Sequence, residues 1–318
     1  MAFYVWRRPG PKIRIRGEYG SREFMRAYRE ALFGEAKPKA APGSLSELIS
    51  AYKQSRAWRE GLSAATRKTR DQFFRKIEAA AGAKPINEID RAMIVATREK
   101  AGSRAAARHI LTTLRGLFKW AVEAERMEAN PTDGVAIPKP VKTQGYHTWT
   151  EPEIAAYKAR WPLGTRQHLW LAVLLHTGLR RGDATRLKWE DIQDGVISVV
   201  AQKNRTPVVI PLEPELAEVM AKTERGRVYV IEGLEGEPYT PESFSVVFGK
   251  ACKAAGVKGS AHGLRKASTT AMAYAGASVP ELNAARGWTG SKMAVRYVES
   301  AERARLAKQA YDRLRKKD

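Results

Sequence analysis

The sequence is short of cysteine and of long apolar runs. Its 318 residues include one cysteine, Cys252, which excludes an internal disulfide and a metal site built from several cysteines. An unpaired cysteine fits a reducing cytosol, and we interpret Cys252 as part of a helix core. No window has the roughly 18 consecutive apolar residues that a membrane helix needs, and arginine-rich sequence follows Met1 in place of a signal-peptide core. We expect a cytoplasmic protein without a membrane partner.

Metal-binding patterns are missing as well. The histidines show no paired ligand spacing and no cluster of carboxylates accompanies them, which argues against a metal-dependent nuclease. We therefore expect neither a metal nor a cofactor. We interpret His109 and His168 as surface or core residues, and His176 as support for the end of its helix. The five histidines are His109, His147, His168, His176 and His262.

Acidic residues are scarce relative to basic ones. The chain has 56 lysines and arginines against 34 aspartates and glutamates, a formal net charge of +22. Cationic side chains that contact phosphates release condensed counterions, so a basic protein binds a polyanion readily. Nucleic acid is the leading partner class, and a merely solvated basic surface is the alternative.

The length predicts about two domains, and 43% hydrophobic residues are enough to form their cores. Residues 1–43 resemble a basic β-hairpin extension: Phe3 and Val5 precede a turn at 7–11, isoleucines alternate with arginines over 13–16 after it, and a short helix follows at 21–33. The composition of 37–43 is typical of a linker. The extension is equally compatible with an arm that touches DNA and with a segment that packs on the next domain.

Residues 44–129 predict a helical bundle. Ser44 and Glu47 form a capping-box pattern at the first helix, and further helices are expected near 63–81, 90–101 and 103–127. On the helix near 63–81, cationic side chains outnumber acidic ones, and apolar residues form the opposite face. That pattern suits a DNA backbone, although ordinary exposed helix faces share it. The cations assigned to DNA binding are Arg67, Lys68, Arg70, Arg75 and Lys76.

Residues 130–149 contain three prolines and little periodicity, which indicates an interdomain linker. Residues 150–318 predict a mainly α catalytic domain with a small β-sheet. A strand pair is expected near 196–201 and 207–212. The expected helices begin at a Thr150 cap and continue near 168–176, 214–224, 241–254, 262–275, 279–286 and 291–310.

Order and spacing single out several polar residues of this domain. An apolar helix ends in His176-Thr-Gly-Leu-Arg180, and Asp183 follows three positions later. The strand pair brackets a lysine, and His-Gly-Leu-Arg opens a later helix. Gly287-Trp288 comes next, and a tyrosine lies nine residues beyond the tryptophan. Each of these residues alone would be interpreted as an ordinary surface or core residue, so the joint pattern carries the argument.

With this pattern the sequence resembles the tyrosine recombinases, or phage integrase family, over about residues 44–310. The resemblance implies a helical core-binding domain and a catalytic domain that together form a clamp around DNA. It assigns six catalytic positions and one supporting acid, Asp183. The sixth catalytic position is most often histidine in the family and is tryptophan here, which changes a role without arguing against activity. The catalytic residues so assigned are Arg180, Lys203, His262, Arg265, Trp288 and Tyr297.

The resemblance also implies a reaction. Arg180 and Arg265 would clamp the non-bridging phosphate oxygens, and Tyr297 would attack phosphorus to give a 3′-phosphotyrosyl link without an energy cofactor. Lys203 would donate a proton to the leaving 5′ oxygen, and His262 would act at the tyrosine side. Tryptophan cannot transfer protons, so Trp288 would donate its indole N–H to the phosphate and pack against the site.

The sequence is therefore interpreted as a site-specific DNA recombinase, the integrase of a prophage or another integrating element in a bacterial, nucleoid-associated setting. Double-stranded DNA and a homotetramer on DNA are the expected partners. The apolar stripe of Leu306, Ala310, Tyr311 and Leu314 would dock on a neighbouring subunit or pack on its own. An accessory DNA-bending or directionality factor is a further expected partner. The alternatives are a chromosome-dimer resolvase, a type IB topoisomerase-like enzyme, and a non-catalytic DNA-binding regulator.

Overall fold

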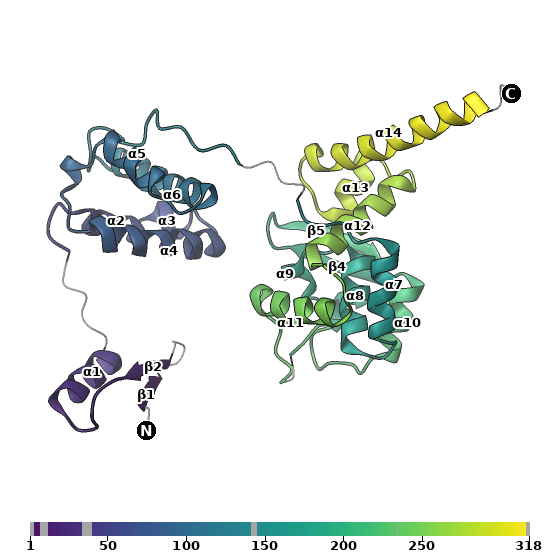
Figure 1. Cartoon of the computed structure of the whole chain (residues 1–318), viewed down its shortest axis with the longest axis horizontal. Coiled ribbons are helices and arrows are strands. Elements are labelled where there is room, and N and C mark those ends of the chain that lie inside the picture. The colour runs from purple at the N-terminus through teal and green to yellow at the C-terminus, as the bar shows by residue number, and fades with distance from the viewer. Residues whose placement is uncertain (1–2, 7–11, 34–39, 141–144, 234, 316–318) are drawn as a thin grey trace. The chain divides into compact units, whose positions relative to one another are not determined.

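The computed structural model describes residues 3–6, 12–33, 40–140, 145–233 and 235–315. The chain divides into two compact units, Met1–Lys142 and Thr143–Asp318 (Figure 1). Helices dominate both units, and the β-structure is limited to small antiparallel sheets, as the sequence predicts. Within the described ranges, no helix is both long enough and apolar enough to span a membrane.

The first unit begins with the predicted hairpin. Strand β1 (Phe3–Trp6) pairs antiparallel with β2 (Lys12–Ile15), and Phe3 lies opposite Ile15. Helix α1 (Arg22–Phe33) follows, and a small core of Val5, Ile15, Phe24 and Ala31 holds these elements together. The predicted turn at 7–11 and residues 37–39 of the predicted linker at 37–43 lie outside the described residues.

The bundle of the first unit contains the four helices that the sequence predicts and a short one that it does not. The predicted helices are α2 (Leu45–Gln54), α4 (Ala64–Ala81), α5 (Arg91–Glu99) and α6 (Arg104–Glu123). The extra helix is α3 (Arg56–Arg59), which is too short to show periodicity. The centre of the core consists of Leu48, Ile49, Phe74, Leu111, Leu114, Leu117 and Phe118.

The ends of α2 and α6 differ from their predicted form. The capping box at α2 is only half formed: Ser44 Oγ accepts from the Glu47 amide, but the Glu47 carboxylate accepts from the amide of Gly43 in place of Ser44. Helix α6 ends at Glu123, four residues earlier than predicted. The chain reverses there because Glu125 adopts a left-handed φ of 53° and the Arg126 amide donates to the carbonyl of Ala121.

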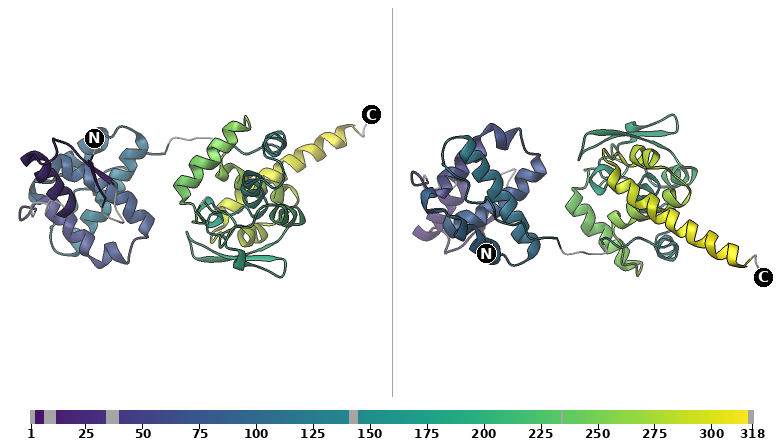
Figure 2. Two further views of the ribbon diagram at one scale, coloured as in Figure 1. Left: turned by 90° about the horizontal axis from the view of Figure 1, so that it is seen from below. Right: turned by 90° about the horizontal axis from the view of Figure 1, so that it is seen from above.

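The second unit is a helical domain with a three-stranded sheet. The sheet has the order β3 (Ile192–Gln193), β4 (Val196–Ala201) and β5 (Thr206–Pro211), and all pairings are antiparallel. Figure 2 shows the helices of this unit gathered beside the sheet. They are α7 (Glu151–Arg160), α8 (Arg166–Thr177), α9 (Arg181–Ala184), α10 (Pro214–Lys222), α11 (Pro241–Ala254), α12 (Ala261–Tyr274), α13 (Val279–Arg286) and α14 (Ser291–Arg315).

Helix α8 forms the centre of this unit. Its residues Leu171, Val173 and Leu174 are fully buried, and α10, α11 and α12 pack against it. Cys252 lies in the same core, as predicted. Because α8 is apolar on nearly all sides, it is a buried helix, and the polar residues that follow its last turn are held by a rigid support.

A smaller core joins the last three helices. It consists of Ala273, Leu282, Ala294 and Ala301 from α12, α13 and α14. Beyond Ala301, α14 extends away from its unit (Figure 1), and nearly all of residues 302–315 are exposed. The exposed fractions of Leu306, Tyr311 and Leu314 are 56%, 65% and 63%, so the predicted apolar stripe is uncovered.

Candidate active site

The turn after α8 positions the first predicted arginine. Gly178 ends the helix in the left-handed conformation, with a φ of 57°, and the Leu179 amide donates to Thr177 Oγ1 at 3.1 Å. A left-handed residue suits glycine because a Cβ would be strained there. Arg180 follows in extended conformation and caps the short helix α9. This turn therefore fixes the backbone from which the Arg180 side chain extends.

Asp183 connects Arg180 to the sheet. Its carboxylate is buried, with Oδ1 accepting from the Gln202 amide at 3.0 Å and Oδ2 lying 4.0 Å from Arg180 Nη1. Within the described part of the chain, Arg180 Nη1 is buried without a hydrogen-bond partner. A buried guanidinium nitrogen that donates no hydrogen bond is costly unless an acceptor occupies the site, so this atom favours an anionic ligand.

Arg265 is the second predicted arginine, and it is only 6% exposed. Its Nη1 donates to the Gly178 carbonyl at 2.5 Å and its Nη2 to the Arg286 carbonyl at 2.9 Å. Burial, Arg180 and Arg286 lower the pKa of Arg265. The side chain still keeps its proton, because the ordinary pKa of arginine lies far above physiological pH.

His262 opens α12 one turn before Arg265. Its ring lies 4.5 Å from that of Tyr146, measured between centroids. Burial lowers the pKa of His262 below its usual range, and the nearby cations Arg265 and Arg180 lower it further. The imidazole is therefore mainly neutral at pH 7 and can accept a proton.

Four of the predicted residues line one cavity of about 360 Å³: Arg180, Lys203, His262 and Arg265. Lys203 is exposed in the turn between β4 and β5. This turn is held on both sides, because the Gln202 amide donates to Asp183 and Asn204 Nδ2 donates to the Gly287 carbonyl at 2.6 Å. The lysine amine therefore projects from an anchored backbone.

Trp288 and Tyr297 are not among the residues that line this cavity. Their rings stack on each other with centroids 5.9 Å apart, and the Arg265 guanidinium lies 5.7 Å from the Trp288 ring centroid. Burial raises the pKa of Tyr297, and Arg265, Arg286 and Arg296 oppose that rise. The phenol is protonated at neutral pH, and its attack on an electrophile requires a proton acceptor.

The predicted DNA-binding cations of α4 have different surroundings. Arg67 donates to the carbonyls of Leu62 and Arg59, and Arg70 donates to the Tyr52 hydroxyl at 3.1 Å. These two are engaged with the bundle itself. Lys68, Arg75 and Lys76 are exposed; Arg75 pairs with Asp71 at 3.3 Å, and Lys76 lies over the Phe73 ring. Contact of the five with DNA stays a prediction.

Sequence reasoning missed three residues of this region. Tyr146 and Arg181 line the cavity with the predicted residues, and Arg286 contacts the backbone beneath it. Tyr146 falls in the predicted linker, and Arg181 directly follows Arg180. Arg286 is the last residue of α13. A basic side chain is common at the end of a helix because it interacts favourably with the helix dipole. None of these positions carries a spacing signal.

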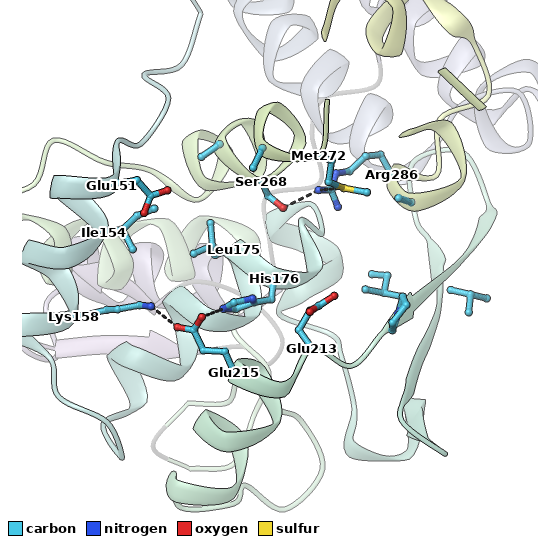
Figure 3. A pocket seen from close by; sticks show the side chains of 16 residues that line it. Glu151, Ile154, Lys158, Leu175, His176, Glu213, Glu215, Ser268, Met272 and Arg286 are labelled. Carbon is cyan, nitrogen blue, oxygen red and sulfur yellow. Dashed lines mark hydrogen bonds and ion pairs between the residues drawn. The ribbon is translucent and has the colours of Figure 1, made fainter. Parts of the chain in front are cut away.

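A second cavity of about 460 Å³ lies between α7, α8, α10 and α12 (Figure 3). Lys158 pairs with Glu215 there, and His176 Nε2 lies 3.5 Å from the same carboxylate. Arg286 reaches its edge, but the cavity contains none of the predicted catalytic residues. Among the residues that the structure describes, no three histidines, cysteines or carboxylates are grouped to hold a metal ion.

Known proteins resemble the chain in both sequence and fold. Residues 151–303 match the phage integrase family. The integrase of Escherichia phage HK022 is 27% identical over 186 residues, which cover 55% of this chain and 52% of that protein. The integrase of Escherichia phage P2 is 31% identical over 138 residues, or 42% and 40% of the two chains. The chain thus spans about half the length of these relatives.

Two solved structures share the fold. A lambda integrase (75–356) dimer bound to a COC′ core site has a TM-score of 0.69 and 22% identity, covering 79% of this chain and 97% of that one. The Tn1549 transposon integrase in complex with transposon right end DNA has a TM-score of 0.67 and 17% identity, covering 84% and 99%.

The second unit thus combines a fold of the integrase type with an arginine-lined cavity. All six predicted catalytic residues fall within the matched segment 151–303. The match covers this segment and not the whole chain, and the resemblance to the tyrosine recombinase family seen in the sequence is confirmed there.

Proposed function

We propose that the protein is a site-specific DNA recombinase, the integrase of a prophage or another integrating element. The observation that carries the proposal is that, among the described residues, the buried Arg180 Nη1 has no hydrogen-bond acceptor, at a cavity that Arg265, His262 and Lys203 also line. Guanidinium groups bind phosphate oxygens with charge-assisted hydrogen bonds. The cavity therefore suits a phosphodiester.

The proposed reaction exchanges one phosphate ester for another. The Tyr297 oxygen attacks phosphorus and its proton passes to a base; the bond from phosphorus to the 5′ oxygen breaks, and that oxygen gains a proton. The product is a 3′-phosphotyrosyl link and a free 5′-hydroxyl. Attack by a 5′-hydroxyl reverses these steps and rejoins the strand, so the bond energy is retained.

Each remaining residue has a role in this scheme. Neutral His262 accepts a proton or a hydrogen bond at the tyrosine side, and Lys203 donates to the leaving oxygen. Trp288 packs on Tyr297 and offers one indole N–H to the phosphate. Asp183 orients Arg180 and the Lys203 turn through its bond to the Gln202 amide.

Replacing Tyr297 with phenylalanine tests the proposal. We expect Tyr297→Phe to bind DNA as well as the parent, because only the hydroxyl is lost, yet to form no covalent adduct. The measurement is incubation with a nicked suicide duplex carrying the element's attachment sequence, followed by denaturing electrophoresis. If neither protein forms an adduct on DNA that both bind, the catalytic assignments fail and a DNA-binding regulator becomes the better explanation.

A chromosome-dimer resolvase is the second candidate, since the tyrosine recombinase XerC of Xylella fastidiosa is 25% identical over 122 residues. A type IB topoisomerase-like enzyme would form the same covalent link. Recombination between attachment sites separates an integrase from both. The integrase assignment would fail if the adduct formed but only supercoil relaxation, or only resolution of chromosome dimers, followed.

We propose double-stranded DNA as the partner, with the bundle and the catalytic unit contacting it as a clamp, in the bacterial cytoplasm in association with the nucleoid. A homotetramer on DNA would couple the sites through the exposed part of α14. Because Ala301 is buried, the test deletes residues 306–318 only. Unchanged assembly on DNA after this deletion would contradict the role of α14.

We also propose an accessory DNA-bending or directionality factor as a partner. Its involvement would be detected if recombination required an added host protein.

A further inference from the structure

The catalytic unit contains a buried cation that the reaction scheme does not use. Arg286, the last residue of α13, is 3% exposed. In the described ranges no carboxylate forms an ion pair with it. Burying an uncompensated charge is costly, so its position calls for an explanation beyond helix stability.

Neutral acceptors surround the Arg286 guanidinium. Nε donates to Thr269 Oγ1 at 2.9 Å and Nη1 to the Thr177 carbonyl at 3.0 Å. Nη2 donates to Ser268 Oγ at 2.7 Å and lies 3.0 Å from Met272 Sδ, the two contacts visible in Figure 3. These bonds engage all three guanidinium nitrogens with neutral acceptors and leave the positive charge unneutralised.

The same residue supports both arginines of the site. Arg286 holds the Thr177 carbonyl, three residues before Arg180, and its own carbonyl accepts from Arg265 Nη2. Arg265 in turn donates to the Gly178 carbonyl. Thr269 completes the connection, because its hydroxyl accepts from Arg286 and donates to the Arg265 carbonyl at 2.8 Å. Displacing Arg286 would therefore disturb both Arg180 and Arg265.

Three cations from three helices lower the pKa of the Tyr297 phenol, against the rise that burial causes: Arg265 from α12, Arg286 from α13 and Arg296 from α14 itself. Asp183 raises the pKa of Arg265, whereas among the described residues no carboxylate contributes to the pKa of Tyr297 or of Arg286. Arg296 is exposed and its field is screened by water, whereas Arg286 is buried and its field is not.

We propose that Arg286 is a positioning residue of the active site, which braces the turn before Arg180 and the Arg265 side chain and directs a buried positive charge at the Tyr297 phenol. The proposal rests on the proposed function, because it assigns a role in the attack by Tyr297. Its electrostatic effect favours the ionised phenol, which develops as the proton leaves.

The test compares three variants in single-turnover adduct formation from neutral pH to the alkaline pH at which the Tyr297 phenol titrates. In Arg286→Met the charge is lost, so we expect slower cleavage throughout the neutral range, with the deficit closing only as the pH approaches the raised pKa of the phenol. Each unit by which the Tyr297 pKa rises lowers the phenolate fraction about tenfold. Arg286→Lys keeps the charge but loses the planar guanidinium that makes several hydrogen bonds at once. We therefore expect slower cleavage at every pH, with a pH dependence like that of the parent. Arg296→Met, an exposed cation facing the same phenol, is the matched control, with little change expected.

A second measurement does not depend on cleavage. A fluorinated tyrosine at position 297 reports its ionisation through the fluorine chemical shift, and we expect Arg286→Met to move that titration to higher pH far more than Arg296→Met. If the parent forms no adduct yet this shift occurs, the proposed function fails and the electrostatic role of Arg286 stands. If the parent forms the adduct and neither readout moves in Arg286→Met, the inference is overturned alone.

A purely structural role would have a different signature, because it would lower folding stability and cleavage equally at all pH values. Thermal unfolding of each variant identifies that case. If Arg286→Met does not fold, Arg286→Lys decides the matter, and cleavage by it at the parent's rate would contradict the bracing role.

Discussion

Arg180 and Arg265 differ in how their donors are used. Both Nη atoms of Arg265 donate to main-chain carbonyls, while Arg180 Nη1 has no hydrogen-bond acceptor within the described part of the chain and lies 4.0 Å from the Asp183 carboxylate. Arg265 therefore holds the site together in addition to any contact with phosphate. Arg180 is the side chain left free to meet a ligand.

This difference leads to a prediction for Arg180→Ala. Loss of a preorganised donor to a charged transition state slows a reaction by about 10²–10³-fold, so we expect cleavage of the suicide duplex to be nearly abolished. DNA affinity should fall only modestly, and the melting temperature should stay close to that of the parent. Cleavage at a near-normal rate would remove Arg180 from the phosphate clamp.

His176 leads to a prediction about pH. Burial lowers its pKa, with Glu215 opposing in part, so the unfolded chain takes up a proton at a higher pH than the folded chain does. Stability should therefore fall as the pH drops below about 6.5. His262 acts in the same direction. The lowered pKa of Glu215, whose main cause is its hydrogen bond with Lys158, acts only in the more acidic range below its ordinary value.

Thermal melting from neutral to weakly acidic pH checks this expectation. His176→Gln should flatten the decrease in melting temperature relative to the parent, and His109→Gln, at an exposed position, should leave it unchanged. Equal slopes in all three proteins would show that His176 titrates alike in the folded and unfolded states.

Most of the candidate site could be predicted at the residue scale because the order and spacing of its members along the chain resemble those of a known family. Arg286 could not, because its role depends on carbonyls and hydroxyls from α8 and α12, more than fifteen positions away at the nearest. Sequence contains no sign of which backbone groups a buried arginine will meet. The stacking of Trp288 on Tyr297, apart from the cavity, was equally invisible.

At the scale of elements, helix positions were predicted more reliably than their exact ends. Helices α11 and α13 match their predicted ranges, since proline, threonine or serine caps and apolar periodicity agree there. Helices α3 and α9 have four residues each and were missed, because one turn carries no periodic signal. The mainly α class with a small sheet is confirmed.

The end of α8 provides a test of an element boundary. A Cβ on Gly178 would lie 2.3 Å from Arg286 Nη1, and the residue also has a left-handed φ of 57°. Gly256 has a φ of 69° with nothing within 4 Å of such a Cβ. We expect Gly256→Ala to cost about 1–2 kcal/mol from backbone strain alone, and Gly178→Ala to cost more.

Chemical denaturation measures the two costs, and Gly178→Ala should also slow adduct formation, because the intruding methyl group displaces the Arg286 guanidinium. Gly249→Ala, in a helix with open space around it, should be neutral or slightly stabilising. Equal costs for the two left-handed glycines would mean that Arg286 moves aside without penalty.

At the scale of the whole molecule, the net charge of +22 predicts a strong salt dependence of DNA binding. A protein that contacts six to ten phosphates loses about 10³–10⁵ in affinity between 50 and 200 mM salt. We expect a linear fall of log affinity with log salt concentration, measured by fluorescence anisotropy. Lys68→Ala, Arg75→Ala and Lys76→Ala together should make the slope shallower, and an unchanged slope would remove this face of α4 from the DNA contact.

The exposed end of α14 has a consequence for amide hydrogen exchange. Residues 302–315 keep their helical hydrogen bonds but have almost no packing to protect them, while residues up to Ala301 lie against the last small core. A helix held mainly by its own backbone opens readily. In the free protein, deuterium should enter 302–315 far sooner than the first turns of α14, and slower uptake on DNA would report that this segment had become covered.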